Sequence, residues 1–111
     1  MAKSRHRVVR LADLPVDTNK GYKVEGRSLL LCRTAAGVFA IDNRCPHQLA
    51  PLEGGRMRGT ALFCPKHGQR FDMRSGATVG QLTKVPVQAY EVCIDEDDNI
   101  EVLLPDHEET P

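Results

Sequence analysis

The stretch CPKHGQRFD, residues 64 to 72, places a cysteine and a histidine three positions apart, with a proline and a glycine beside them. A shorter segment of the same kind, CPHQ, occupies residues 45 to 48. Thiolate and imidazole groups are the ligands that zinc and some iron-sulfur clusters use in proteins. The two segments therefore predict one metal site formed by four residues: Cys45, His47, Cys64 and His67.

Both segments have the composition of loops. Each follows a short strand-like patch, VFAI at 38–41 or ALF at 61–63. The proline after each cysteine sets φ at a turn position, and Gly68 permits backbone conformations that point successive N–H groups toward an anion. We therefore expect two loops that project from one end of the strands.

Strand-like patches separated by turn residues recur along the whole chain. They are RVV at 7–9, YKV at 22–24, SLLLCR at 28–33, VFAI at 38–41, ALF at 61–63, VQAYEVCI at 87–94 and IEVLL at 100–104. The segment ADLP shows at most a turn of helix. This pattern predicts an all-β fold, a small antiparallel sandwich or open barrel.

The length of 111 residues, with 41% hydrophobic residues, suits a single domain over residues 1–111. We expect the metal-binding loops within about 43–75 and a frayed acidic tail at about 106–111. The N-terminal segment lacks the apolar stretch of a secretory signal, and the longest aliphatic run is LLL at 29–31. Four cysteines without an export signal predict reduced thiols in the cytoplasm.

Charge is balanced overall and unevenly distributed. The chain carries 15 basic and 15 acidic residues, which argues against nucleic acid or a membrane as partner. Residues 45–84 hold six Lys or Arg against two acids, whereas residues 95–111 hold eight acids and no Lys or Arg. Lys66 and Arg70, close to the predicted site, favour a partner with an acidic surface.

The ligand types leave two metals open. Structural zinc sites usually begin with two cysteines two to four residues apart, and the pair Cys45 and His47 does not supply that arrangement. Chance Cys/His pairs would need no metal, but the proline and glycine residues around both pairs argue against chance. An iron-sulfur cluster is the favoured interpretation, and a zinc-bound interaction module remains the alternative.

The motifs CPHQLAPLEGG and CPKHGQRFD resemble those of the Rieske [2Fe-2S] proteins. The resemblance runs from VFAIDNRCPH through GQRFDMRSG to VPVQAYEVCIDEDDNIEV. It implies three stacked antiparallel sheets, with one [2Fe-2S] cluster held by two loops at a tip. It also implies that Cys45 and Cys64 bind one iron and that His47 and His67 bind the other, and it places a third loop near Pro86.

The same resemblance indicates which kind of Rieske protein this is. Members of high reduction potential carry two further cysteines in the loops, where this chain has Ala50 and Lys66. They also carry a serine and a tyrosine, whose hydroxyls donate hydrogen bonds to the cluster, where this chain has Gln69 and Phe71. The resemblance therefore implies a centre of low potential.

The remaining histidines, His6 and His107, do not suffice for the mononuclear iron site of a terminal oxygenase. We therefore expect an electron carrier and not an enzyme. Its predicted role is that of a monomeric ferredoxin, which passes single electrons from a flavin-dependent reductase to the terminal oxygenase of an aromatic-ring hydroxylating dioxygenase system. The small subunit of an assimilatory nitrite reductase is the alternative. For Cys32 and Cys93, which match no ligand position, core packing is predicted.

Overall fold

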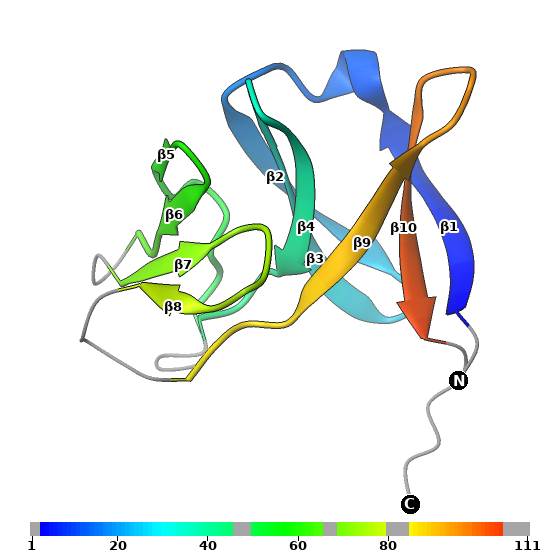
Figure 1. Cartoon of the computed structure of the whole chain (residues 1–111). Helices are drawn as coiled ribbons and strands as arrows, with labels where there is room; N and C mark the ends of the chain where they lie inside the picture. Colours follow the sequence, from blue (N-terminus) through cyan, green and yellow to red (C-terminus); the bar gives the residue numbers. More distant parts are fainter. Residues whose placement is uncertain (1–2, 46–49, 66–68, 80–84, 106–111) are drawn as a thin grey trace, which may run out of the picture.

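The structure is a computed structural model that describes residues 3–45, 50–65, 69–79 and 85–105. These residues form ten strands and one turn of 3-10 helix (Figure 1). The elements are β1 (Lys3–Arg10), η1 (Leu11–Asp13), β2 (Thr18–Val24), β3 (Arg27–Thr34), β4 (Gly37–Asp42), β5 (Met57–Arg58), β6 (Ala61–Phe63), β7 (Arg70–Asp72), β8 (Thr78–Val79), β9 (Ala89–Ile94) and β10 (Asn99–Pro105). The predicted all-β fold is confirmed.

Six strands form one antiparallel sheet in the order β1-β10-β9-β4-β3-β2. This sheet curls into a half-barrel, which occupies the right-hand side of Figure 1. Strand β9 pairs with β10 on one side and with β4 on the other. Because β9 belongs to both pairings, two of the three sheets implied by the family resemblance are joined into one.

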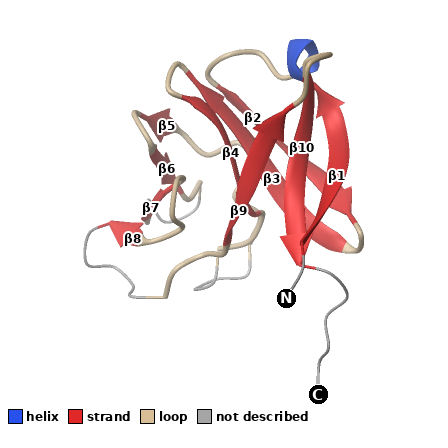
Figure 2. Cartoon of the chain, turned by 45° about the vertical axis from the view of Figure 1, so that its right-hand side comes forward, coloured by secondary structure: helices blue, strands red, loops and turns tan. Residues whose placement is uncertain are grey.

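The remaining strands form a four-stranded antiparallel sheet in the order β5-β6-β7-β8. It stands beside the half-barrel, as both cartoon views show (Figures 1 and 2). The sequence predicts β6 directly, and β7 lies within GQRFDMRSG, a segment that the family resemblance covers. The sequence does not predict β5, which has only two residues and pairs with β6 through Met57 and Leu62.

Strand β3 is the wall between two hydrophobic cores. Leu29 and Leu31 pack into the core of the half-barrel, whereas Leu30 and Cys32 pack into the core shared with the small sheet. All four side chains have no exposed surface. Successive side chains of a strand point to opposite faces, so a strand with two buried faces requires an unbroken apolar run. This requirement explains the LLLC segment.

The turn between β2 and β3 shows how local chemistry sets the register. Glu25 and Gly26 both have positive φ, at 51° and 80°, and they connect the paired residues Val24 and Arg27. Two central residues with positive φ define the tight hairpin turn whose twist matches that of the flanking strands. Within the described part of the chain, no helix has the length and apolar character needed to cross a membrane.

Candidate metal centre

The two cysteine-containing loops begin in different sheets and close in the same way. Cys45 follows β4 of the half-barrel, and its N–H donates to the carbonyl of Ala50 at 2.7 Å. Cys64 follows β6 of the small sheet, and its N–H donates to the carbonyl of Gln69, also at 2.7 Å. In each loop the bond joins a cysteine to the residue five positions later. The matched closure supports the prediction of a paired site.

Both cysteines face one hydrophobic core. Cys45 is 1% exposed and Cys64 is 2% exposed, and they share this core with Leu52, Phe71 and nine further hydrophobic residues, three of them only partly buried. All four cysteines of the chain are free thiols. Two buried thiols on facing loops fit the thiolate half of a [2Fe-2S] site. The predicted ligands His47 and His67 lie outside the described residues.

Within the described residues, no group of three or more His, Cys, Asp or Glu side chains gathers to hold a metal ion. The described contribution to the site therefore consists of the two thiols. Their position in a shared apolar core limits the access of water to the sulfur atoms. Because water screens charges, electrostatic interactions around a cluster bound there would be stronger than in solvent.

Two asparagines, which the sequence analysis did not identify, hold the end of the first loop. Asn43 Oδ1 accepts hydrogen bonds from the N–H groups of Leu52 and Glu53, at 2.8 and 2.9 Å. Asn19, on β2, accepts from the N–H of Gly54 at 2.7 Å and donates to the carbonyl of Gly55 at 3.0 Å. These bonds attach the segment that leaves the first loop to the wall of the half-barrel.

Replacing Asn43 with alanine is expected to loosen this segment. The N–H groups of Leu52 and Glu53 would lose their acceptor, and the Leu52 group, which belongs to a buried residue, costs about 1–3 kcal/mol when unsatisfied. Hydrogen exchange over residues 52–55, measured by mass spectrometry, should become about tenfold faster or more. Asn43→Asp keeps an acceptor oxygen and serves as the matched control. Equal exchange in the alanine variant and the wild type would contradict this role for Asn43.

A third segment, residues 85–88, borders the same core. Val87 is 6% exposed within the core that holds Cys45 and Cys64, and its N–H donates to the carbonyl of Gly76 at 2.9 Å. A Cβ atom on Gly76, whose φ is +81°, would lie 2.0 Å from the Val87 carbonyl oxygen. Only glycine permits so close an approach. Pro86 itself is exposed, and this arrangement supports the expected third loop near the site.

The side chains of Gln69 and Phe71 are both buried beside the second loop. Gln69 is 2% exposed, and its Nε2 donates to the carbonyls of Arg70 at 2.8 Å and Val79 at 3.5 Å. Its Oε1 is buried without a hydrogen-bond partner among the described residues. Phe71 has no exposed surface and packs in the core of Cys45 and Cys64. The Gln69 amide donor is therefore engaged by the backbone of β7 and β8.

The structure separates the two cysteines for which core packing was predicted. Cys32 is fully buried, as predicted, and burial raises the pKa of its thiol to about 12. Cys93 lies on β9, where it pairs with Glu101 of β10, and it is only partly buried. The prediction of core packing is therefore wrong for this residue. The reason is its position on the less covered face of β9. His6 Nδ1 lies 3.9 Å from Glu25 Oε2, so His6 neighbours a carboxylate and not the two cysteine loops. His107 lies outside the described residues.

The all-β architecture and the paired cysteine loops define a small β protein with two buried thiols, of the type that metal cofactors use as ligands, in one core. A sequence profile described as the Rieske [2Fe-2S] domain matches residues 4–91. The chain belongs to the Rieske [2Fe-2S] family, and its cofactor is a [2Fe-2S] cluster. This finding decides against the zinc-bound module.

Relatives of known role cover almost the whole chain. The ferredoxin component of naphthalene 1,2-dioxygenase/salicylate 5-hydroxylase systems from Ralstonia sp is 35% identical over 95 residues, which span 85% of this chain and 88% of the relative. The ferredoxin of carbazole 1,9a-dioxygenase from Nocardioides aromaticivorans IC177 is 32% identical, with a TM-score of 0.81 over 92% of this chain and 97% of that structure. These relatives are electron-transfer components, not oxygenase enzymes.

Two further solved structures bear on the partner and on the alternative function. A complex of reduced oxygenase and oxidised ferredoxin in carbazole 1,9a-dioxygenase contains a chain 25% identical to this one, with a TM-score of 0.79, covering 88% of this chain and 91% of that chain. A structure named as a nitrite reductase small subunit from Mycobacterium tuberculosis has a TM-score of 0.84 at 19% identity, covering 93% of this chain and 96% of that chain. The second likeness shows the shared fold alone.

Proposed function

We propose that this protein is a Rieske-type ferredoxin, which carries single electrons to the terminal oxygenase of an aromatic-ring hydroxylating dioxygenase system. The observation that carries this proposal is the match to ferredoxin components along nearly the full length of both chains. The oxygenase components themselves are longer proteins: this chain spans 32% of the terminal oxygenase of carbazole 1,9a-dioxygenase. The donor in the proposed system is a flavin-dependent reductase.

In this proposal Cys45 and Cys64 bind one iron of the cluster, and His47 and His67 bind the other. The cluster supplies reversible one-electron chemistry at a potential above that of all-cysteine ferredoxins. The described residues hold the sulfur ligands: backbone bonds close both loops, and Leu52 and Phe71 exclude water on the core side. Asn43 and Asn19 keep the first loop attached to the half-barrel.

The proposal also covers the organisation and location of the protein. Residues 1–111 form one Rieske domain, with the cluster-binding loops at about 43–75. The predicted acidic tail at about 106–111 lies outside the described residues. The protein acts as a monomer in the cytoplasm, and its four free thiols are consistent with a reducing compartment.

Reconstitution tests the proposed function. The purified protein should contain two irons and two acid-labile sulfides per chain, and stoichiometric zinc without labile sulfide would contradict the assignment. Mixed with a flavin reductase and a terminal oxygenase from the same gene cluster, it should make product formation depend on ferredoxin concentration. If this protein reduces the large subunit of a nitrite reductase and not the oxygenase, its function is that of a nitrite reductase small subunit.

A further inference from the structure

The outer face of the small sheet carries a row of side chains next to the second loop. Phe63 on β6 pairs with Arg70 on β7, which pairs with Val79 on β8. The guanidinium of Arg70 lies 5.9 Å from the centre of the Phe63 ring. The guanidinium of Arg56 lies 5.6 Å from the same ring centre. Two cations therefore stack on one aromatic ring, an arrangement that restricts both arginines.

Three arginines at the edge of the small sheet have their charges unpaired within the described part of the chain. Among the described residues, neither Arg56, Arg58 nor Arg70 forms an ion pair with a carboxylate. Elsewhere Arg5 lies 3.6 Å from Glu101, and Arg7 lies 3.8 Å from Asp95.

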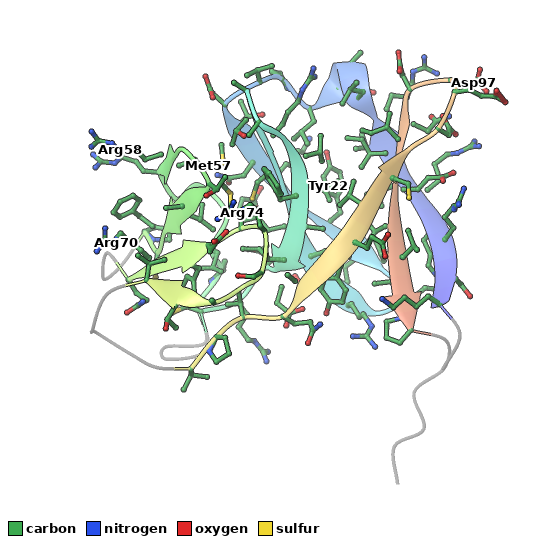
Figure 3. The ribbon with its side chains drawn as sticks, viewed as in Figure 1. Tyr22, Met57, Arg58, Arg70, Arg74 and Asp97 are labelled. Atoms are coloured by element: carbon green, nitrogen blue, oxygen red, sulfur yellow. The ribbon has the colours of Figure 1, made fainter. Side chains whose placement is uncertain are left out.

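The acid of the small sheet, Asp72, is already paired with another arginine, Arg74. Asp72 accepts hydrogen bonds from the guanidinium of Arg74, the shorter at 2.9 Å, and the Arg74 bonds hold the pKa of Asp72 below its usual range. Arg56, Arg58 and Arg70 therefore form an uncompensated positive patch. Figure 3 shows Arg58 and Arg70 pointing away from the half-barrel at the edge of the small sheet.

The patch combines positive charge with exposed apolar surface. Val79 is 37% exposed and Phe63 is partly buried. An open hollow of about 350 Å³ extends from the patch to the second loop, and the described residues that line it are Gly54, Arg56, Phe63, Cys64 and Pro65. The patch therefore reaches a cysteine of the cluster site. A molecule bound there would lie next to the redox centre.

The opposite end of the molecule carries an acidic turn. The turn between β9 and β10 carries four consecutive acids, residues 95–98, and Asp97 lies across the molecule from Arg58 and Arg70 in Figure 3. The net charge is zero, so the protein has no general attraction to polyanions. The positive patch and the acidic turn, where Arg7 offsets Asp95 in part, give the molecule a charge dipole. Such a dipole orients the small-sheet end toward an acidic surface and turns the β9–β10 end away from it.

We propose that Arg56, Arg58, Phe63 and Arg70 form the docking surface for the terminal oxygenase, and that the oxygenase presents carboxylates around a small apolar contact. This inference rests on the proposed function. Arginine and aromatic side chains are typical of the centre of protein interfaces. The placement beside Cys64 brings the acceptor to the cluster end of the ferredoxin.

Single charge reversals test the patch. Arg56→Glu and Arg70→Glu each change the net charge by the same amount as Arg10→Glu, which replaces an exposed arginine of β1. On a carboxymethyl resin at pH 7, the first two variants should elute at clearly lower salt than the wild type. Arg10→Glu should elute close to the wild type. Equal shifts in all three variants would show that only net charge matters and would overturn the patch.

Electron delivery to the oxygenase identified by reconstitution provides the second measurement. At low ionic strength, Arg56→Glu and Arg70→Glu should lower the second-order rate constant about tenfold each and flatten its dependence on salt. Arg10→Glu should leave both unchanged. The visible spectrum and the reduction potential of every variant are recorded, so that loss of the cluster or of driving force is distinguished from loss of docking.

The outcomes separate this inference from the proposed function. If the wild-type protein delivers electrons and the patch variants deliver them equally fast, the docking surface is wrong and the function stands. If only the step from the reductase slows, the oxygenase is not the occupant. If the wild-type protein reduces no oxygenase, the proposed function and this partner assignment fail together, and the resin measurement still decides whether the patch binds carboxylates.

Discussion

Replacing Cys45 or Cys64 with serine is expected to remove the cluster, so that iron content falls from two atoms per chain to nearly none and the visible absorption disappears. Both thiols lie in the core, at 1% and 2% exposure, and the other thiol of this core, Cys32, is fixed within β3 and not on a loop. Metal binding and folding are coupled. We therefore also expect faster hydrogen exchange in both loops, with the half-barrel intact because its core is separate.

The controls for this experiment follow from the burial of the other two cysteines. Cys93 is partly exposed, so Cys93→Ser should retain the full spectrum. Cys32 is fully buried, and a serine there would bury a hydroxyl at a cost of about 1–3 kcal/mol. Cys32→Ala is therefore the cleaner control, and it should also retain the cluster. Retention of two irons in Cys45→Ser or Cys64→Ser would contradict the ligand assignment.

The double substitution Gln69→Ser with Phe71→Tyr is expected to raise the reduction potential. Hydroxyl donors at these positions would stabilise the reduced cluster, which carries one more negative charge. A hydrogen bond to a charged group is worth roughly 1.5–3 kcal/mol, and about half of that should differ between the two oxidation states. Each hydroxyl then shifts the potential by roughly 30–65 mV, taking about 59 mV per 1.4 kcal/mol for one electron.

The structure supports this expectation in two ways. Phe71 is fully buried among the residues that pack against Cys45 and Cys64. The Nε2 of Gln69 donates to the carbonyls of Arg70 and Val79, which leaves it less free to replace a missing serine hydroxyl. The wild-type potential should accordingly lie near the low end of the Rieske range, at roughly −150 mV.

Protein-film voltammetry measures these potentials directly. Phe63→Tyr adds the same hydroxyl on the outer face of the small sheet and is the matched control, with no shift expected. A wild-type potential above zero would refute the low-potential assignment. A double variant with an unchanged potential would show that the hydroxyl positions do not govern the potential in this protein.

Local patterns predicted most of the strands because their signals are local. The run SLLLCR and the patch ALF became β3 and β6. Cys45 and Cys64 were also predicted as candidate metal ligands, from residue type and spacing. Thiol and imidazole chemistry at short intervals is a sequence property, and it does not depend on how the sheets pack.

Other features depended on contacts between distant residues. Asn19 acts on Gly54 and Gly55 across 35 or more positions, and nothing in its own neighbourhood distinguishes it from a solvent-exposed asparagine. The burial of Cys32 and the partial exposure of Cys93 likewise follow from how the sheets cover each strand, since both lie in similar apolar segments.

The sequence by itself therefore determined the all-β fold class and indicated Cys45 and Cys64 as candidate metal ligands, because these depend on residue type, spacing and short-range periodicity. The family resemblance carried by its motifs identified the [2Fe-2S] cofactor. Only the tertiary structure decided that the two loops close in the same way from different sheets, and that Arg56 and Arg70 stack on Phe63 beside Cys64. Those arrangements are set by strand register between β6 and β7 and by packing against the half-barrel. Register and packing join residues far apart in the chain, and a one-residue shift would move each side chain to the opposite face of its sheet.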